Sequence, residues 1–243
     1  MSNHSITVLI TAYNEEKTIA DAVYHTGKAL QKYTQDYEII VFDDGSKDDT
    51  GKIADVLAQN NFRLMVVHNE VNKNLGPNLR AGVALAKKEY IMAFVNADTY
   101  PTEEAFQGIF SAIGKKELIL GYSVDYGDRP WPRRFLSWAF VKIMNFLFGF
   151  HIRYYNGPII VKSAAWRTVP MTTDSFAYMA EVTATLLKRG ASYEEVPMFY
   201  TPELKGLNVS VLRRNIMGVI KALASLFWRL NIKQEFYKNN KKI

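Results

Sequence analysis

The chain has 243 residues, a formal net charge of +6, no cysteine and a hydrophobic share of 48%. This length is enough for one large α/β domain, or two small ones, with a substantial core. The lack of cysteine excludes disulfides and cysteine-ligated zinc and fits a reducing compartment. The basic balance suits anionic partners such as nucleotides, nucleic acid or acidic lipid headgroups.

Strands and helices are expected to alternate through the first half of the chain. Short β-branched or apolar runs predict strands at 6–11, 37–42, 62–67 and 90–95. Helical spacing predicts helices at 15–30, 49–59 and 77–87. Such alternation implies a mostly parallel sheet with helices on both faces, in which ligands bind beyond the carboxyl ends of the strands.

The second half of the chain is less regular. We expect an edge strand at 117–121, a tight loop at 154–158 and an extended segment at 193–200. Helices are expected at 134–150, 176–189 and 211–231. The sequence contains no uncharged run of about 18 residues, and its N-terminus lacks a signal-peptide pattern, so we expect no transmembrane helix.

Polar clusters follow three of the predicted strands. They are Tyr13-Asn14-Glu15, Asp43-Asp44 and Asn96-Ala97-Asp98. Each alone is typical of a turn, but parallel strands end at one edge of a sheet, so the three clusters are expected to meet there. Neither G-x-G-x-x-G after the first strand nor G-x-x-x-x-G-K-S/T is present, which argues against a classical dinucleotide fold and a P-loop. A carboxylate-rich edge instead suits a nucleotide that arrives with a divalent metal ion.

Four blocks of sequence carry a family resemblance: TAYNEEKTI, EIIVFDDGSKDDT, NKNLGPNLRAGVALA and VNADTYP. In order and spacing they resemble the GT-A nucleotide-sugar glycosyltransferases, and more narrowly the inverting, dolichyl-phosphate-mannose-synthase-like branch of family 2. The resemblance implies one α/β domain of the GT-A fold, with a nucleotide-sugar half at 1–115, an acceptor half at 116–200 and a C-terminal amphipathic helix and basic tail at 201–243. It also implies that a sugar is transferred, with inversion, from a UDP- or GDP-sugar to a polyprenyl phosphate.

The resemblance assigns the donor base and ribose to the first two clusters. The residues expected there are Ala12, Tyr13, Glu15, Asp43 and Asp44.

The segment Asn96-Ala97-Asp98 stands where the family has its D-x-D motif. The resemblance implies that Asp98 holds Mg²⁺ or Mn²⁺ on the donor diphosphate, while Asn96 keeps hydrogen-bonding capacity without charge. Mg²⁺ commonly accepts one or two protein carboxylates when phosphates and water complete its shell. Tyr100 is a second departure, since the branch often has a glutamine there. A plain Asx turn is the alternative reading of this segment.

On the acceptor side, the resemblance assigns Arg133 and Ser137 to the acceptor phosphate, with Arg134 beside them, because an arginine fork suits a phosphate. Asn156, in the loop YYNGP, is expected to contact the sugar. The position at which related enzymes have their catalytic base is occupied by Met179, which cannot accept a proton. A lipid phosphate is already ionised and needs no base. A solvated basic turn is the alternative reading of the arginines.

Two helices are expected to meet a membrane. In 134–150 and 211–231, polar residues form one narrow arc and bulky apolar residues the rest, which is typical of helices that lie in the membrane interface. We therefore expect a peripheral protein at the cytoplasmic, inner face of a membrane. Packing of these helix faces on the core or in an oligomer is the alternative. Basic residues interleaved with bulky aliphatics argue against nucleic-acid binding.

Two other functions stay open from the sequence. The same donor site can serve a hydroxyl acceptor, with Glu181, Asp125 or Asp128 as the base, although the resemblance implies that Glu181 orders the site. A nucleotide-sugar-binding scaffold without activity is the other, motivated by Asn96 and Tyr100.

Overall fold

A computed structural model of the chain describes residues 1–124, 131–174, 177–201 and 209–235, without the side chains of Phe94, Arg133 and 209–217. Its centre is one sheet of seven strands in the order β3-β2-β1-β4-β6-β5-β7. The strands are β1 (Ile6–Ala12), β2 (Tyr37–Asp43), β3 (Leu64–His68), β4 (Tyr90–Asn96), β5 (Leu118–Ser123), β6 (Ile159–Lys162) and β7 (Tyr193–Met198). Of these, β6 alone runs antiparallel to its neighbours, which confirms the mostly parallel sheet predicted from the sequence.

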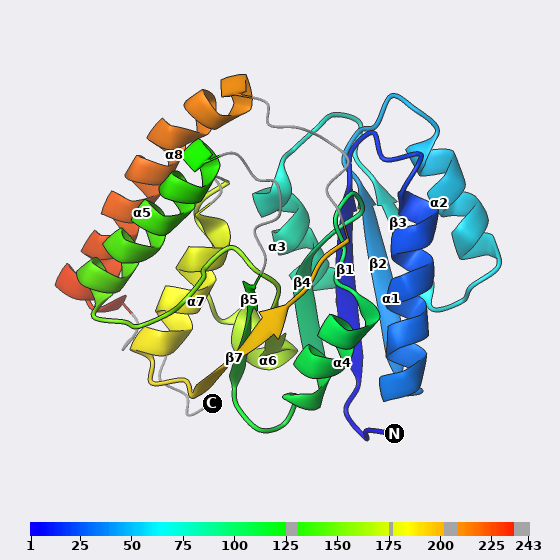
Figure 1. Ribbon diagram of the computed structural model, residues 1–243, viewed down its shortest axis with the longest axis horizontal. Helices are drawn as coiled ribbons and strands as arrows, with labels where there is room; N and C mark the ends of the chain where they lie inside the picture. Colours follow the sequence, from blue (N-terminus) through cyan, green and yellow to red (C-terminus); the bar gives the residue numbers. More distant parts are fainter. Residues whose placement is uncertain (125–130, 175–176, 202–208, 236–243) are drawn as a thin grey trace.

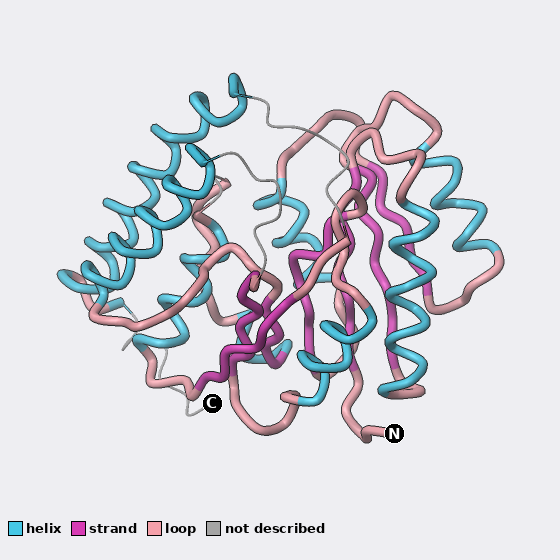
Figure 2. The backbone as a smooth tube through the Cα atoms, in the orientation of Figure 1, coloured by secondary structure: helices cyan, strands magenta, loops and turns pink. Residues whose placement is uncertain are grey.

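Helices cover both faces of this sheet (Figure 1). One face carries α1 (Ile19–Tyr33), α2 (Thr50–Gln59) and α4 (Glu103–Ser111). The other face carries α3 (Leu75–Leu85), α6 (Ser163–Arg167) and α7 (Tyr178–Lys188). Outside α7, a further layer consists of α5 (Trp131–Phe148) and α8 (Val209–Phe227), with α8 continuing into a π-helical turn, η1 (Trp228–Ile232). Figure 2 shows α5 and α8 side by side at the edge of the molecule.

The two-residue period of the strands divides the apolar side chains between two cores. On β1, Val8 and Ile10 join the cluster under α1 and α4, whereas Leu9 joins the cluster under α3 and α7. Both faces of the sheet are buried, which is why its strands read as nearly continuous apolar runs. Within the described ranges, no helix combines the length and apolar content needed to cross a bilayer.

The structure corrects the expectation of an edge strand at 117–121. β5 pairs with both β6 and β7 and is therefore interior, so that β7 forms this edge of the sheet. The reason is β6, a strand of only four residues that was not expected from the sequence and that pairs between β4 and β5. The short helix α6 and the helix α4 are also absent from the sequence-based expectation, although Thr102 caps α4 by accepting a hydrogen bond from the N–H of Ala105.

The other elements of the first half have the predicted type, with most ends within one or two residues. Both ends of α1 are exceptions, because the helix begins at Ile19 and not at 15, and ends at Tyr33 and not at 30. The carbonyl of Glu15 instead accepts hydrogen bonds from the N–H groups of Thr18 (3.0 Å) and Ile19 (2.9 Å), which closes a turn before the helix.

Candidate active site

The three polar clusters meet at the carboxyl edge of β1, β2 and β4. Ala12 pairs in register with Asp43, and Thr11 pairs with Asn96. After β3 the chain returns to the far side of β1, so the strand order reverses between β1 and β4. Open α/β sheets bind ligands beyond the strand ends at such a reversal.

Asp44 is buried and organises the loop before α3. Its carboxylate accepts hydrogen bonds from the backbone N–H groups of Lys73 (2.9 Å) and Asn74 (3.0 Å) and from Asn69 Nδ2 (2.9 Å). Asn69 Nδ2 also donates to Asn78 Oδ1 on α3 (2.6 Å). Charge-assisted bonds of this kind are strong, so Asp44 fixes the rim of the site between β2 and α3.

Asp43 belongs to a chain of charged groups with His68 and Asp55. His68 Nδ1 lies 2.9 Å from Asp43 Oδ2, and His68 Nε2 lies 3.0 Å from Asp55 Oδ1. The hydrogen bond with Asp43, followed by that with Asp55, raises the pKa of His68 above its ordinary value. A charged imidazole donates from both ring nitrogens, so protonated His68 matches both carboxylates.

The loop after β1 is held against the loop after β2. Asn14 has a positive φ of 55°, a left-handed conformation that asparagine adopts more readily than most residues, and its N–H donates to Ser46 Oγ (3.0 Å). Glu15 is buried, and its N–H donates to Thr50 Oγ1 (2.7 Å). Tyr13 is 43% exposed and extends from this fixed loop toward solvent.

Asn96 and Asp98 are partly exposed at the end of β4, with the buried Ala97 between them. Thr11 Oγ1 donates to Asn96 Oδ1 (3.1 Å), and the N–H of Ala97 donates to the carbonyl of Thr11 (3.0 Å). Carboxylate and amide oxygens are ligands that Mg²⁺ and Mn²⁺ accept. In the part of the chain that the structure describes, no three histidine or acidic side chains cluster to hold a metal by themselves. The carboxylate of Asp98 and the amide oxygen of Asn96 suit an ion that takes its other ligands from phosphate and water.

Tyr100, the second departure from the family pattern, packs against α1. Its ring stacks on that of His25, with centroids 5.5 Å apart and an interplanar angle of 18°. Its N–H donates to Thr201 Oγ1 (3.2 Å), and its carbonyl accepts from the N–H of Thr201 (3.0 Å). The backbone at this position thus joins the end of β4 to the segment after β7, while the side chain packs on α1.

The acceptor residues predicted at 133–137 fall on the first turns of α5. Arg134 is exposed and Ser137 half-exposed. Positions three apart on a helix are neighbours, so these two side chains share one flank of α5. Arg133 lies in the same turn, and its side chain is outside the described part of the structure.

The loop YYNGP packs against β5 where only glycine fits. A Cβ on Gly157 would lie 1.9 Å from the carbonyl oxygen of Gly121. The antiparallel pairing of Ile159 with Ala93 places this loop beyond the same end of β4 that carries the D-x-D-like segment. Asn156 Oδ1 is buried and has no hydrogen-bond partner among the described residues, so it is available to a ligand hydroxyl or a water.

Glu181 is buried in the first turn of α7, and both its oxygens are engaged. Oε2 accepts from the N–H groups of Thr172 (2.9 Å) and Thr173 (3.2 Å), and Oε1 accepts from Thr172 Oγ1 (2.6 Å). Arg229 of η1 forms an ion pair with the same Oε1. Glu181 therefore orders the loop before α7. Met179, at the family's base position, is fully buried.

A small cavity lies beneath the donor edge, on the α3 side of the sheet. Its lining consists of Leu9, Thr11, Phe42, Leu75, Asn78, Leu79, Ala93 and Tyr178. Asn78 Nδ2 is buried there without a partner among the described residues. None of the donor residues predicted from the sequence lines the cavity, so we expect the donor above the edge and not inside it.

Residues 7–174 match the sequence model of the family described as Glycosyl transferase family 2. Glycosyltransferase GlyG of Streptococcus pneumoniae is 29% identical over 125 residues, which cover 51% of this chain and 40% of that protein. An undecaprenyl-phosphate 4-deoxy-4-formamido-L-arabinose transferase of Pseudomonas fluorescens is 24% identical over 193 residues, which cover 72% of this chain and 54% of that protein. The chain thus spans about half the length of these curated relatives or less.

Among solved structures, glucosyl-3-phosphoglycerate synthase of Mycobacterium tuberculosis with Mn²⁺, UDP and phosphoglyceric acid has a TM-score of 0.70 at 16% identity, covering 93% of this chain and 79% of that one. A structure of the same enzyme with Mg²⁺ and UDP has a TM-score of 0.65 at 14% identity, covering 90% and 79%. At such low identity the likeness concerns the fold alone, and it confirms the GT-A architecture expected from the sequence.

Proposed function

The chain belongs to glycosyl transferase family 2, and from this premise we propose that it transfers a sugar, with inversion, from a UDP- or GDP-sugar to a polyprenyl phosphate. The observation that carries the proposal is the meeting of Ala12, Asp43 and the segment 96–98 at one edge of the sheet. The relative named for undecaprenyl phosphate supports the choice of acceptor.

The donor nucleotide would lie over the loops after β1 and β2. We place Ala12, Tyr13 and Glu15 at the base and ribose, with Asp43 and Asp44 at the border of the base. The exposed ring of Tyr13 offers an apolar face to a base. Hydrogen bonds already order these loops, so less conformational entropy is lost when a donor binds.

A divalent cation, Mg²⁺ or Mn²⁺, would be held by Asp98, with Asn96 beside it. When bound, such an ion offsets the negative charge that develops on the departing diphosphate. Asp98 is partly exposed at the end of β4. The metal-containing structures of the M. tuberculosis enzyme support this choice of cofactor.

Arg133, Arg134 and Ser137 would hold the acceptor phosphate, and Asn156 would contact the sugar. A phosphate oxygen that is already ionised attacks the anomeric carbon as the bond to the diphosphate breaks, so no residue has to remove a proton. The contacts of Glu181 and the apolar side chain of Met179 support an acceptor of this kind.

The lipid tail of such an acceptor stays in a bilayer. We therefore place the protein at the cytoplasmic, inner face of a membrane, in contact through the helices predicted at 134–150 and 211–231.

A donor screen tests this function. Purified protein is incubated with labelled UDP- or GDP-sugars, Mn²⁺, detergent and either a short polyprenyl phosphate or the matched polyprenol. We expect product with the phosphate and none with the alcohol. Product with the alcohol alone would contradict the proposed acceptor.

The rival function, transfer to a hydroxyl, makes the opposite prediction. It requires a base, so Glu181→Gln would abolish transfer and leave donor hydrolysis intact. The other two acids considered for this role, Asp125 and Asp128, lie outside the described residues. Tight donor binding without turnover of any donor would instead favour a nucleotide-sugar-binding scaffold without activity.

A further inference from the structure

The outer side of α5 exposes aromatic side chains. Positions 131, 135, 138, 142 and 146 recur every three or four residues and so form one stripe. Its members are Trp131 (76% exposed), Phe135 (56%), Trp138 (57%), Phe146 (88%) and the exposed Lys142. Met144 and Phe148, on the opposite side of the helix, are buried in the core.

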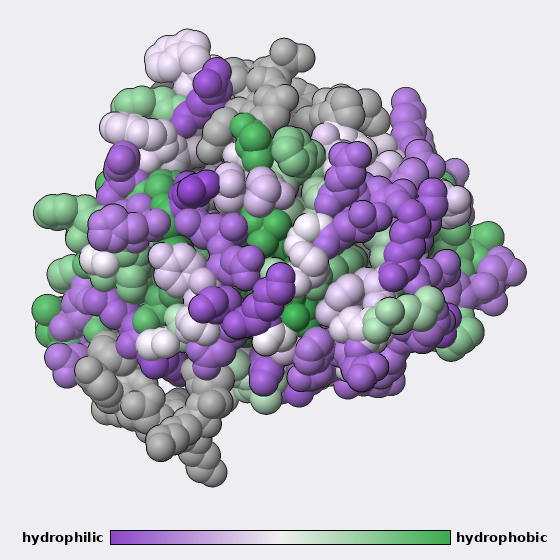
Figure 3. Space-filling view, turned by 60° about the horizontal axis from the view of Figure 1, so that its bottom comes forward, coloured by the Kyte–Doolittle hydropathy of each residue, from purple (hydrophilic) through white to green (hydrophobic). Residues whose placement is uncertain are grey.

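The outer side of α8 and η1 continues this surface. Residues four apart again form a stripe, which consists of Ile220 (53% exposed), Ala224, Trp228 (54%) and Ile232 (53%), with the exposed Lys221 beside it. Leu226 and Leu230 on the other side are buried. We call the two stripes together the aromatic face. In Figure 3, hydrophobic side chains interrupted by hydrophilic ones lie along the edge of the molecule that these helices form.

The aromatic face differs from the polar arc that the helical wheel of 134–150 suggests. Asn145, a member of that arc, points inward. Its Nδ2 donates to the carbonyl of Ile152 (2.8 Å), and its Oδ1 accepts from the N–H of Ile152 (3.1 Å) and from the hydroxyl of Tyr155 (2.8 Å). The polar positions of α5 thus serve the protein's interior as well as its surface, while bulky aromatic residues remain outside.

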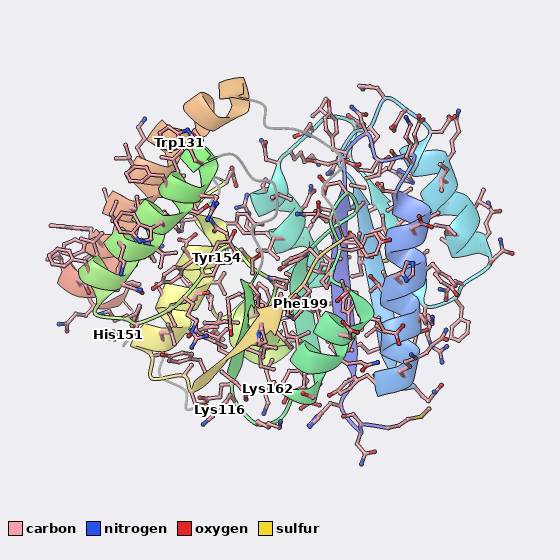
Figure 4. The ribbon with its side chains drawn as sticks, viewed as in Figure 1. Lys116, Trp131, His151, Tyr154, Lys162 and Phe199 are labelled. Atoms are coloured by element: carbon pink, nitrogen blue, oxygen red, sulfur yellow. The ribbon has the colours of Figure 1, made fainter. Side chains whose placement is uncertain are left out.

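Tryptophan is concentrated on this face. The chain has four tryptophans, of which Trp131, Trp138 and Trp228 belong to the aromatic face and Trp166 is fully buried. Figure 4 labels Trp131 at the start of α5, and its side chain is exposed. Tryptophan favours the headgroup region of a bilayer, where an apolar ring with one polar N–H suits both environments.

The charge of these helices indicates which kind of bilayer fits. The sequences of α5, α8 and η1 contain arginine and lysine but no aspartate or glutamate. Lys142 and Lys221 are exposed within or beside the stripes. Arg229 differs, because its side chain is only 13% exposed and forms an ion pair with the buried Glu181. The nearest acid after η1, Glu235, pairs with Lys233. An apolar face with cations and no acids complements an anionic lipid surface.

We propose that the aromatic face docks on an anionic lipid bilayer, with its rings at headgroup depth and Lys142 and Lys221 at the lipid phosphates. This inference rests on the membrane contact in the proposed function and goes beyond it by assigning the residues and the lipid charge. Arg134 lies on the flank of α5, one turn before Trp138. It would therefore lie at the depth of the lipid phosphates, which is also the depth of the phosphate group of a polyprenyl phosphate.

Vesicle binding tests the proposal without any sugar donor or polyprenyl phosphate. The full chain is sedimented with vesicles of phosphatidylcholine, or of phosphatidylcholine mixed with phosphatidylglycerol, while tryptophan fluorescence is recorded. We expect binding and a blue shift with the anionic vesicles, both weakened by salt. Lys142→Gln combined with Lys221→Gln should weaken binding about thirtyfold, at about fivefold per cation.

The aromatic residues are tested by Trp138→Ala combined with Phe146→Ala, which should abolish binding. The matched control is Tyr24→Ala combined with Phe62→Ala, because these residues are 61% and 90% exposed and lie outside α5 and α8. The control should bind like the wild type. Circular dichroism confirms that each variant is folded.

Three results would overturn the proposal: no binding by the wild type, equal binding to both kinds of vesicle, or binding that survives the loss of Trp138 and Phe146. If the wild type forms a dimer in solution and binds no vesicles, and the same double substitution makes it monomeric, the aromatic face is instead a contact between two copies of the chain. Transfer to detergent-solubilised polyprenyl phosphate by a protein that ignores vesicles would overturn this inference alone. Vesicle binding without transfer to any acceptor would support it and count against the proposed function.

Discussion

The donor edge and the outer helical layer hold their side chains in opposite ways. At the donor edge, Glu15, Asp43 and Asp44 are at most 9% exposed, and hydrogen bonds tie their loops together. In the outer layer, Trp131 and Phe146 are more than 70% exposed. The fold has thus already ordered the first region, so substitutions there should act on folding and on donor binding together. The second region can change at its surface with little effect on the core.

The largest expected effect breaks this contrast, because Arg229 of the outer layer forms an ion pair with the buried Glu181 of α7. Arg229→Met would leave Glu181 buried without its ion-pair partner, which typically costs about 3–5 kcal/mol of unfolding free energy. Urea denaturation measures the loss. Arg80→Met is the control, since its partner Asp174 is 60% exposed, and it should cost about 1 kcal/mol or less. Equal losses in the two variants would mean that the Glu181 pair behaves as a surface pair.

Asp98→Ala tests the one partly exposed acid of the donor edge. Loss of the proposed metal ligand should lower kcat/KM for transfer by about 10²–10³, the range seen when one stabilising group is removed from a charged transition state. Unfolding free energy should hardly change, because Asp98 is not buried. Asp36→Asn is the matched control, because this 64% exposed carboxylate precedes β2 and so lies at the opposite end of the parallel strands from Asp98. It should leave the rate unaltered. A similar rate for both variants would remove Asp98 from the mechanism.

Asp44→Ala tests whether a buried acid of the donor edge serves both the fold and the donor. The loop before α3 would lose the acceptor of two backbone N–H groups, and bonds to a charged group are worth about 1.5–3 kcal/mol. We expect lower unfolding free energy and weaker donor binding in the same variant, measured by urea denaturation and calorimetric titration. Weaker donor binding at unchanged stability would show that Asp44 contacts the donor without ordering the loop.

The smallest effect is the pH dependence set by His68. Its pKa is raised in the folded state by the hydrogen bonds with Asp43 and Asp55, so protonated His68 stabilises the fold. This contribution is complete below the ordinary histidine pKa of about 6.5 and is lost as pH rises through the higher folded value. Its size should stay below about 1 kcal/mol, because the side chain is 45% exposed. His68→Gln should flatten this step in stability-versus-pH curves, and an unchanged step would assign it to another group.

Much of the donor edge follows from local sequence patterns. Apolar runs predict the strands, and polar residues after each run predict the ends at which Asp43 and Asn96 lie. Parallel pairing then brings these ends to one edge without further information. The match of Ala12 with Asp43 in register confirms that expectation.

The partners of these residues could not be predicted in the same way. Thr11 bonds to Asn96 across 85 positions of sequence, and His68 bonds to Asp43 across 25. Such contacts depend on register and on the positions of whole elements, which no local pattern encodes. On α5, a helical wheel places Asn145 on the polar arc that faces solvent, whereas the chain that returns after the helix supplies Ile152 and Tyr155 as its hydrogen-bond partners.

The three hydrogen bonds of Asn145 have a practical meaning for protein engineering. They make the end of α5 and the segment that leads to Asn156 one mechanical unit, and burial raises the pKa of Tyr155 so that its hydroxyl keeps the proton it donates. A chimera that receives α5 from a homologue should therefore import 131–155 as a single cassette. Exchange of the helix alone would break the hydrogen bonds of Asn145 with Ile152 and Tyr155 and would displace the loop that carries Asn156.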